Sequence, residues 1–94
     1  MKVSREYSAP ALERGIEILQ LFSHERTKIS APEIVRELQL NRSSTFRLLR
    51  TLERLHCVIR VDEGAYSVGP RALHLGSRLL ASAAVEIPYL EPRP

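Results

Sequence analysis

The sequence predicts a small, mainly α-helical domain that carries one β-hairpin. Apolar residues recur at helical spacing in three separate stretches, which indicates three amphipathic helices. Two β-prone runs then flank a short turn that contains glycine, as expected for a hairpin. The chain has 94 residues, of which 44% are hydrophobic, so we expect one domain with a thin core.

The first helix is expected to follow a loose polar start at residues 1–8. Ser8 is a candidate N-cap, and Pro10 is tolerated in the first turn, where its missing N–H would have no helical partner. Four apolar residues then recur at helical spacing and are expected to pack in the core: Leu12, Ile16, Leu19 and Phe22. A polar break follows, and residues 28–29 are expected to form a very short strand.

The second helix begins with a capping-box pattern, in which Ser30 accepts from the amide of Glu33 and the Glu33 side chain reaches back. Pro32 suits the first turn of the same helix. The apolar face of this helix consists of Ile34, Val35 and Leu38. The helix is short, because Asn41 is a good N-cap for a third helix.

The third helix, residues 42–55, is predicted to have two opposite faces. A step of ~100° per residue gathers the leucines on one side, with Thr45 near their centre: Leu48, Leu49, Leu52 and Leu55. The opposite side collects Ser43, Arg47, Arg50 and Arg54, with Phe46 at its edge. We therefore expect the leucines to hold the helix to the core while the arginines face outward.

Residues 58–61 and 65–68 are the expected strands of the hairpin. Pro70 can open a fourth helix, whose apolar side needs a partner, either the first helix of the same chain or a second copy. The candidate dimer contacts on this helix are Leu73, Leu79 and Leu80. The expected organisation is a flexible N-terminus at 1–8, a folded domain at 9–69, and a linker helix with the start of a further region at 70–94.

Positive charge is concentrated in one part of the chain. The whole chain has a net charge of +3. Residues 41–60 alone contain five arginines and one acid, a local charge of +4. Such a local excess is typical of a surface that binds phosphate, although a solvated helix face would look the same from charge alone.

Several classes of site are not supported by the sequence. Cys57 is the only cysteine, which excludes an internal disulfide and a cysteine-based zinc site, and it is expected to be a small buried residue. The three histidines are too far apart in sequence to suggest a metal motif. No nucleophile–base set or phosphate loop is present, so we expect no enzyme activity and no cofactor. Without a signal peptide or an apolar run of the ~20 residues needed to cross a bilayer, a cytoplasmic protein without a membrane partner is expected.

The order helix, short strand, helix, tight turn, helix and hairpin is typical of a winged helix-turn-helix, which places the helix after the turn in the DNA major groove. Arg47 and Arg50 are candidates for base readout, since arginine can bind guanine O6 and N7 together. Arg42, Ser43 and Ser44 suit phosphate contacts, with helix capping as the alternative for the serines.

The remaining candidate contacts lie at the edges of this surface. Phe46 could touch a thymine methyl or fold back onto the second helix. Arg54 and Arg60 are candidates for contact with the DNA backbone, whereas Tyr66 is expected in the core. The turn at residues 62–64 is acidic, which argues against deep insertion of the hairpin into the minor groove.

Three segments of the chain also resemble a known family. "ALERGIEILQLF", "KISAPEIVRELQLNRSSTFRLLRTLERL" and "YSVGPRALHLG" resemble the DNA-binding domain of IclR-type bacterial transcription regulators. The resemblance implies a winged helix-turn-helix, dimeric binding to a pseudo-palindromic DNA operator, and control of a catabolic or efflux operon in the bacterial nucleoid. It also implies a linker helix from about residue 70 that leads to a separate C-terminal domain, which binds a small-molecule effector.

The chain departs from the family pattern at particular positions. Gln39 and His56 stand where glycine is common, so the alternatives at both positions are a strained positive φ or a shifted turn. Thr45 replaces an apolar residue, and its hydroxyl is expected to bond a backbone carbonyl one turn back. The chain ends at Pro94, and "VEIPYLEPRP" resembles at most the first residues of the effector domain, so no residue here is assigned to ligand sensing. A winged helix used as a protein-interaction module is the alternative function.

Overall fold

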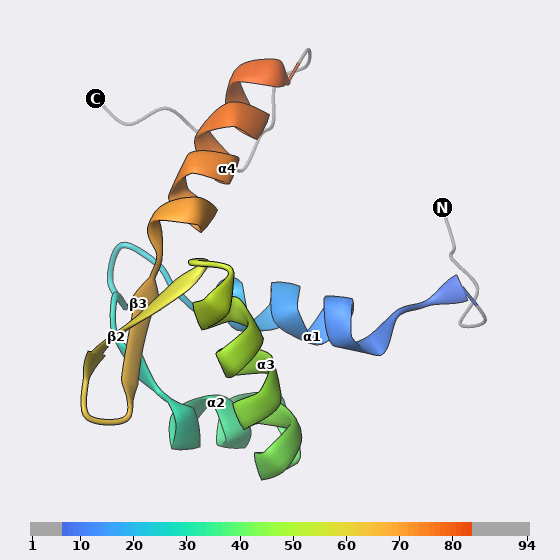
Figure 1. Ribbon diagram of the computed structural model, residues 1–94, viewed down its shortest axis with the longest axis vertical. Helices are drawn as coiled ribbons and strands as arrows, with labels where there is room; N and C mark the ends of the chain where they lie inside the picture. The colour runs from blue at the N-terminus through green and yellow to red at the C-terminus, as the bar shows by residue number, and fades with distance from the viewer. Residues whose placement is uncertain (1–6, 84–94) are drawn as a thin grey trace.

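The computed structural model describes residues 7–83 and contains four helices and three strands. In chain order these are α1 (Pro10–Leu19), β1 (Ile29–Ser30), α2 (Ala31–Leu38), α3 (Arg42–Arg54), β2 (Val58–Asp62), β3 (Ala65–Val68) and α4 (Pro70–Ser82). Figure 1 shows α4 projecting from one end of the domain, whereas α2 and the beginning of α3 lie at the opposite end. The predicted mainly α-helical fold with a small β-wing is confirmed.

The wing is the hairpin formed by β2 and β3, and it is part of a three-stranded antiparallel sheet with the order β1-β3-β2. Ile29 lies opposite Tyr66, and Val58 lies opposite Val68. The sequence placed the short first strand one residue too early, because Ser30 both pairs with Ala65 and caps α2. The wing is therefore attached at β1 to the start of the helix-turn-helix.

The core draws on every element except α4. Its fully or almost fully buried apolar residues are Ile18, Ile29, Ala31, Ile34, Leu49, Val58 and Tyr66. Tyr66 is therefore a core residue, as predicted. No residue of α4 is buried, so the described part of this helix rests on the domain only at its base.

The first helix corrects two sequence predictions. Leu12 and Ile16 were expected in the core, but their exposed fractions are 67% and 49%, and Ile18 is fully buried instead. Leu19 and Phe22 do pack against the core. Leu12 and Ile16 instead line an apolar groove between α1, α3 and α4 that is open to solvent. Ser8 is not the N-cap either: Ala9 occupies that position without a side-chain hydrogen bond, and Pro10 opens the helix as expected.

Two tight turns frame α3. Gln39 ends α2 with φ 53°, and His56 follows α3 with φ 63°. Of the two alternatives left open by the sequence, the strained positive φ is the one observed at both positions. A non-glycine residue in this region costs roughly 1–2 kcal/mol, so packing around both turns must offset that cost.

Two backbone hydrogen bonds connect the segment after α3 to the start of α4. The Gly69 amide donates to the Cys57 carbonyl at 2.7 Å, and the Arg71 amide donates to the His56 carbonyl at 2.9 Å. Gly69 is buried, and a Cβ at this position would overlap the His56 backbone. Glycine is thus required here by a close approach of two backbone segments, which the sequence analysis did not find.

Candidate nucleic-acid interface

The helix-turn-helix is held together by local hydrogen bonds that the sequence predicted. Ser30 caps α2: its hydroxyl accepts from the Glu33 amide at 3.3 Å, while the Ser30 amide donates to Glu33 Oε1 at 2.8 Å. After the turn at Gln39, the Leu40 amide donates to the Val35 carbonyl at 3.1 Å. The capping box fixes where α2 begins, and the bond from Leu40 fixes where it ends and therefore how α3 is set against it.

The N-terminus of α3 is fixed by Asn41. Its Oδ1 accepts from the Ser44 amide at 3.1 Å and from the Ser43 hydroxyl at 3.0 Å. The Thr45 hydroxyl is fully buried and donates to the Asn41 carbonyl at 2.9 Å, which confirms the bond expected from the sequence. Ser43 and Ser44 are exposed beside this cap.

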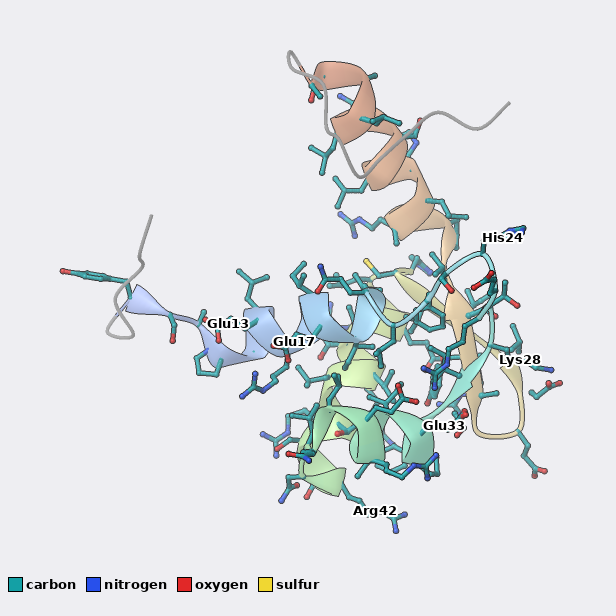
Figure 2. The ribbon with its side chains drawn as sticks, turned by 180° about the vertical axis from the view of Figure 1, so that it is seen from behind. Glu13, Glu17, His24, Lys28, Glu33 and Arg42 are labelled. Carbon is teal, nitrogen blue, oxygen red and sulfur yellow. The ribbon has the colours of Figure 1, made fainter. Side chains whose placement is uncertain are left out.

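The two faces of α3 are separated as the sequence predicted. Leu49 is fully buried, and Leu48 and Leu52 pack against the core. Four arginines of the same helix are exposed and form no ion pair within residues 7–83: Arg42, Arg47, Arg50 and Arg54. Figure 2 shows Arg42 pointing away from the body, at the end of the domain opposite α4. We call this exposed side of the helix the α3 arginine face.

Phe46 lies at the border between the α3 arginine face and α2. It is 41% exposed and lines a small hollow together with Pro32, Val35 and Arg42. Both readings of this residue are therefore geometrically available: one part of the ring leans towards α2, and the rest is open to a partner.

Two cations in or next to the wing already have partners, Arg60 on β2 and Lys28 just before β1. Arg60 donates to Glu53 Oε1 at 3.2 Å, and its guanidinium lies 5.6 Å from the centre of the Tyr66 ring. Lys28 pairs with Asp62 at 2.6 Å. Arg60 is thus directed towards α3 and the core, unlike the arginines of the α3 arginine face.

A second ion-pair group supports α2. Arg26 donates to both carboxylate oxygens of Glu37, with one of the two bonds at 2.7 Å, and it lies 3.7 Å from Glu33. The bond from Arg26 holds the pKa of Glu37 below its usual value, although desolvation opposes this effect. The Ser30 amide, followed by the Ser30 hydroxyl, lowers the pKa of Glu33. These exposed contacts tie the loop before β1 to the outer side of α2.

Two hollows adjoin the N-terminal half of α1. One, of about 380 Å³, lies between α1 and the start of α3 and brings Arg14 and Arg47 to the same surface together with Ser44. The other, of about 430 Å³, is an apolar groove between α1, α3 and α4, lined in part by Leu12, Ile16, Leu52, Leu55, Cys57 and Leu75. Sequence reasoning found neither, because each joins elements that are distant along the chain.

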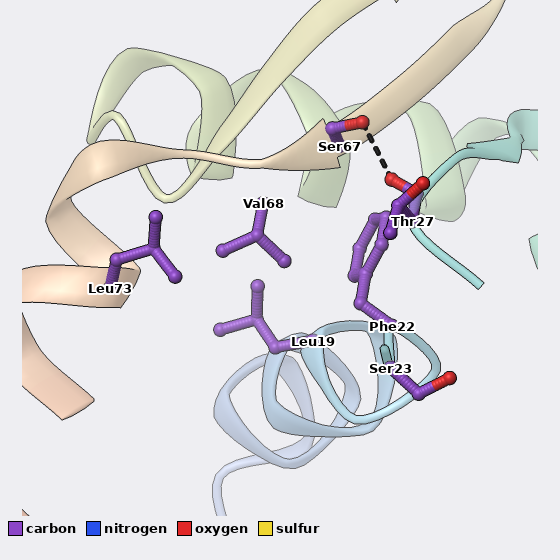
Figure 3. A pocket seen from close by; sticks show the side chains of 7 residues that line it. All are labelled: Leu19, Phe22, Ser23, Thr27, Ser67, Val68 and Leu73. Carbon is purple, nitrogen blue, oxygen red and sulfur yellow. Dashed lines mark hydrogen bonds between the residues drawn. The ribbon is translucent and has the colours of Figure 1, made fainter. Parts of the chain in front are cut away.

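The base of α4 packs on its own chain. Leu73 shares a hollow of about 380 Å³ with Leu19, Phe22 and Val68, next to the hydrogen bond of 2.6 Å that Ser67 donates to the Thr27 carbonyl. Figure 3 shows these side chains facing one another from α1, the segment that follows it, β3 and α4. Leu79 and Leu80 lie further along α4, and all three leucines are exposed, Leu73 the most at 64%. Of the three candidate dimer leucines, Leu73 thus has neighbours within the same chain.

The described chain contains neither a metal-binding cluster of side chains nor a membrane-crossing helix. Residues 7–83 contain no group of three or more His, Cys, Asp or Glu side chains that could hold a metal ion. Within the same range, no helix has the length and apolar character to cross a membrane.

Comparison with known proteins identifies the family. The model of the IclR helix-turn-helix domain matches residues 11–60, more than half of the chain. The chain belongs to the IclR helix-turn-helix family. This match includes α2, the turn at Gln39 and the whole of α3.

Individual IclR relatives agree with this assignment. The HTH-type transcriptional repressor AllR of Klebsiella pneumoniae is 39% identical over 75 residues, which are 79% of this chain and 28% of that protein. An IclR family transcriptional regulator from Brucella abortus superposes with a TM-score of 0.75 at 29% identity over 85% of this chain and 31% of its own. A regulator from Alicyclobacillus acidocaldarius gives a TM-score of 0.71 at 32% identity, covering 78% of this chain and 30% of that one.

The IclR assignment defines the general function of the chain. It is a helix-turn-helix DNA-binding domain of a transcription regulator, and its relatives are regulators rather than enzymes. The chain matches about 30% of the length of these relatives. The family assignment favours DNA binding over the alternative of a protein-interaction module.

Proposed function

We propose that the chain binds operator DNA sequence-specifically, with α3 in the major groove. The supporting observation is the α3 arginine face: one helix of the helix-turn-helix buries its leucines and presents four arginines that have no ion-pair partner in the described chain. The major groove is ~12 Å wide and admits one helix. Unpaired guanidinium groups there can bind base edges and phosphates without first breaking internal ion pairs.

Within this face, the residues have different proposed roles. Arg47 and Arg50 lie one to two turns into the helix and read guanine, each bidentate pair contributing ~1–3 kcal/mol of discrimination. Arg42, Ser43 and Ser44 lie at the helix start and contact phosphate. In the unbound chain the Ser43 hydroxyl donates to Asn41, so it has to turn away from Asn41 in order to donate to a phosphate oxygen.

The outer contacts are proposed to be weaker. Phe46 offers its exposed edge to a thymine methyl, and Arg54 reaches the DNA backbone further along the groove. Arg60 would have to exchange Glu53 for a phosphate before it could contribute. Because the turn of the wing at residues 62–64 is also acidic and would be repelled by phosphate, we propose that the wing adds little to affinity.

Dimeric binding is proposed to depend on α4 and the outward stripe of α1. Leu79 and Leu80 on α4 are exposed, and Leu12 and Ile16 on α1 are exposed as well. Burying such residues against a second copy removes apolar surface from water. Leu73 would support the dimer from the base of the helix. Two recognition helices ~34–36 Å apart would then read successive major-groove faces of a pseudo-palindromic operator.

The regulatory setting is proposed from the family. The relative from Klebsiella pneumoniae is a repressor, and we propose repression here too, of a catabolic or efflux operon in the bacterial cytoplasm. In this proposal, residues 9–69 form the DNA-binding domain and residues from 70 connect it to a C-terminal domain that binds the effector. The part of this linker beyond Ala83 lies outside the described residues.

The proposed function is tested by fluorescence anisotropy of the 94-residue chain with duplexes from its own upstream region, at several salt concentrations. Wild type is expected to prefer one duplex, and log affinity should fall by about 0.9 per phosphate contact for each log unit of salt. Arg47→Ala and Arg50→Ala are expected to lose that preference. Affinity that is independent of salt, or unchanged in both variants, would contradict the proposal and direct the search to protein partners by pull-down.

A further inference from the structure

We propose that Arg14, on α1, binds a phosphate of the DNA backbone beside the recognition helix, while the neighbouring Arg47 reads a base and adds its positive charge to the same hollow. The proposal rests on the proposed function and extends it to α1. Arg14 lies in the "LERG" segment, which the recognition-helix model does not use. The proposed ligand is a phosphodiester, a singly charged anion with free oxygens.

The geometry brings together two cationic side chains from separate elements. Arg14 on α1 and Arg47 on α3 line the same hollow of about 380 Å³ between these helices, and Ser44 lies at the same surface. Arg47 also belongs to the α3 arginine face. The hollow is therefore continuous with the surface proposed to meet DNA, and a strand whose bases face α3 would run along its opening.

Within residues 7–83, Arg14 pairs only with Glu17, and this pair is weakly held. A single nitrogen, Nη1, approaches both carboxylate oxygens of Glu17, at 3.2 and 3.4 Å. The two side chains are 44% and 43% exposed and stand three residues apart on one helix turn. Exposed ion pairs of this kind contribute little to stability because water and salt screen them. The guanidinium has five N–H donors, so most of its capacity remains for another anion.

A phosphate is the anion that best fits this arrangement. Arginine binds phosphate oxygens through parallel N–H donors, and charge-assisted bonds of this kind are stronger than neutral ones. Arg47 contributes a second positive charge. The Ser44 hydroxyl forms no hydrogen bond within the described chain, so it can donate to the anion. Binding would exchange the Glu17 contact for a phosphate contact and fix α1 relative to the DNA.

The first test compares Arg14→Ala with Arg71→Ala by anisotropy on a preferred and a mismatched duplex. Both changes remove one exposed positive charge, but Arg71 lies at the start of α4, next to the far end of α3. Arg14→Ala is expected to weaken both duplexes by the same factor and to reduce the salt slope by about 0.9, so that its deficit shrinks about 3.5-fold between 50 and 200 mM salt. Arg71→Ala should leave the slope unchanged. Circular dichroism confirms that both variants are folded.

The second test uses the two acids that flank Arg14 on α1, labelled in Figure 2. Glu17→Gln and Glu13→Gln remove the same charge, but only Glu17 contacts Arg14. Glu17→Gln is expected to strengthen binding more than Glu13→Gln does. The difference between the two variants should vanish when each change is made separately in the Arg14→Ala background.

The outcomes separate this proposal from the proposed function. If Arg14→Ala behaves like Arg71→Ala while Arg47→Ala and Arg50→Ala lose sequence preference, the phosphate role of Arg14 is wrong and the recognition-helix assignment stands. If Arg14→Ala changes the relative affinity of the two duplexes, Arg14 reads bases instead of phosphate. If no arginine variant alters DNA binding, the proposed function itself fails.

Discussion

The α3 arginine face and the wing both carry positive charge, but they present it differently. The arginines of α3 are exposed without ion-pair partners in the described chain, whereas Arg60 pairs with Glu53 and Lys28 pairs with Asp62 on the wing. A cation already balanced by a carboxylate must lose that contact before it binds phosphate. The comparison teaches that the number of arginines is a poor guide to a DNA-binding surface until their partners are known.

The strongest effect is expected where the two regions are joined. Gly69→Ala would place a Cβ against the His56 backbone, next to the bonds that connect the end of α3 to α4. We expect a loss of about 2 kcal/mol or more in the free energy of unfolding, since neither backbone segment can move freely. Urea denaturation followed by circular dichroism measures this loss.

The matched control is Gly76→Ala, within α4, where a Cβ would meet no atom within 4 Å. Alanine favours a helix interior over glycine by about 0.8–1.0 kcal/mol, so this variant should be as stable as wild type or more stable. Equal losses in the two variants would show that Gly69 is not held by its close approach to His56.

The N-cap of α3 can be weakened without touching the wing. Asn41→Ala removes the oxygen that accepts from the Ser44 amide and the Ser43 hydroxyl. Stability is expected to fall by about 1 kcal/mol, the usual cost of losing such a cap. Asn41→Ser keeps a capping oxygen and should retain most of the stability in the same denaturation experiment. A serine variant as unstable as the alanine variant would argue that the amide nitrogen of Asn41, not its oxygen, matters.

The wing can be made to resemble the α3 arginine face. Glu53→Gln removes the carboxylate that pairs with Arg60. If the released guanidinium reaches phosphate, the salt slope of DNA binding should rise by about 0.9 and affinity should increase a few-fold. Combining it with Arg60→Ala should abolish the increase. If Glu53→Gln gives the same gain over Arg60→Ala alone, the gain comes from the lost carboxylate charge and not from Arg60.

The smallest expected effect concerns acid stability at α2. The pKa values of Glu33 and Glu37 lie below their usual value near 4.5 in the folded chain. A carboxyl with a lowered pKa stabilises the fold above its unfolded pKa, and this contribution disappears as pH falls through the folded value. Glu37→Gln should therefore have a lower free energy of unfolding than wild type at neutral pH, and this difference in stability should shrink below pH ~4.5. Glu63→Gln, at the exposed wing tip, should track wild type throughout a urea series at decreasing pH.

Much of the fold was predictable because local rules decide it. Residues within one or two helical turns of each other determine the cap at Asn41, the capping box at Ser30 and the two faces of α3. Short-range hydrogen bonds and helical spacing fix such features before the chain packs. The unusual backbone at Gln39 and His56 was indicated by the family resemblance and not by a local rule.

The features that the sequence did not reveal depend on distant parts of the chain. The spacing of Leu12 and Ile16 shows that they share a face, but not whether that face meets the core or lies outside it. The requirement for glycine at position 69 follows from the approach of His56, and the common hollow of Arg14 and Arg47 follows from how α1 crosses α3. The pairing of Arg60 with Glu53 likewise needed the sheet to be placed. These are consequences of tertiary packing rather than of local pattern.

The central claim is tested most directly by removing two positive charges from each region in turn. Arg47→Ala with Arg50→Ala is compared with Lys28→Ala with Arg60→Ala, using anisotropy on a preferred and a mismatched duplex at matched salt. We predict that the α3 pair loses the preference, worth ~1–3 kcal/mol for each bidentate contact, while the wing pair keeps it with a small change in affinity. Equal loss of preference in the two double variants, or loss only in the wing pair, would contradict the assignment of sequence recognition to α3.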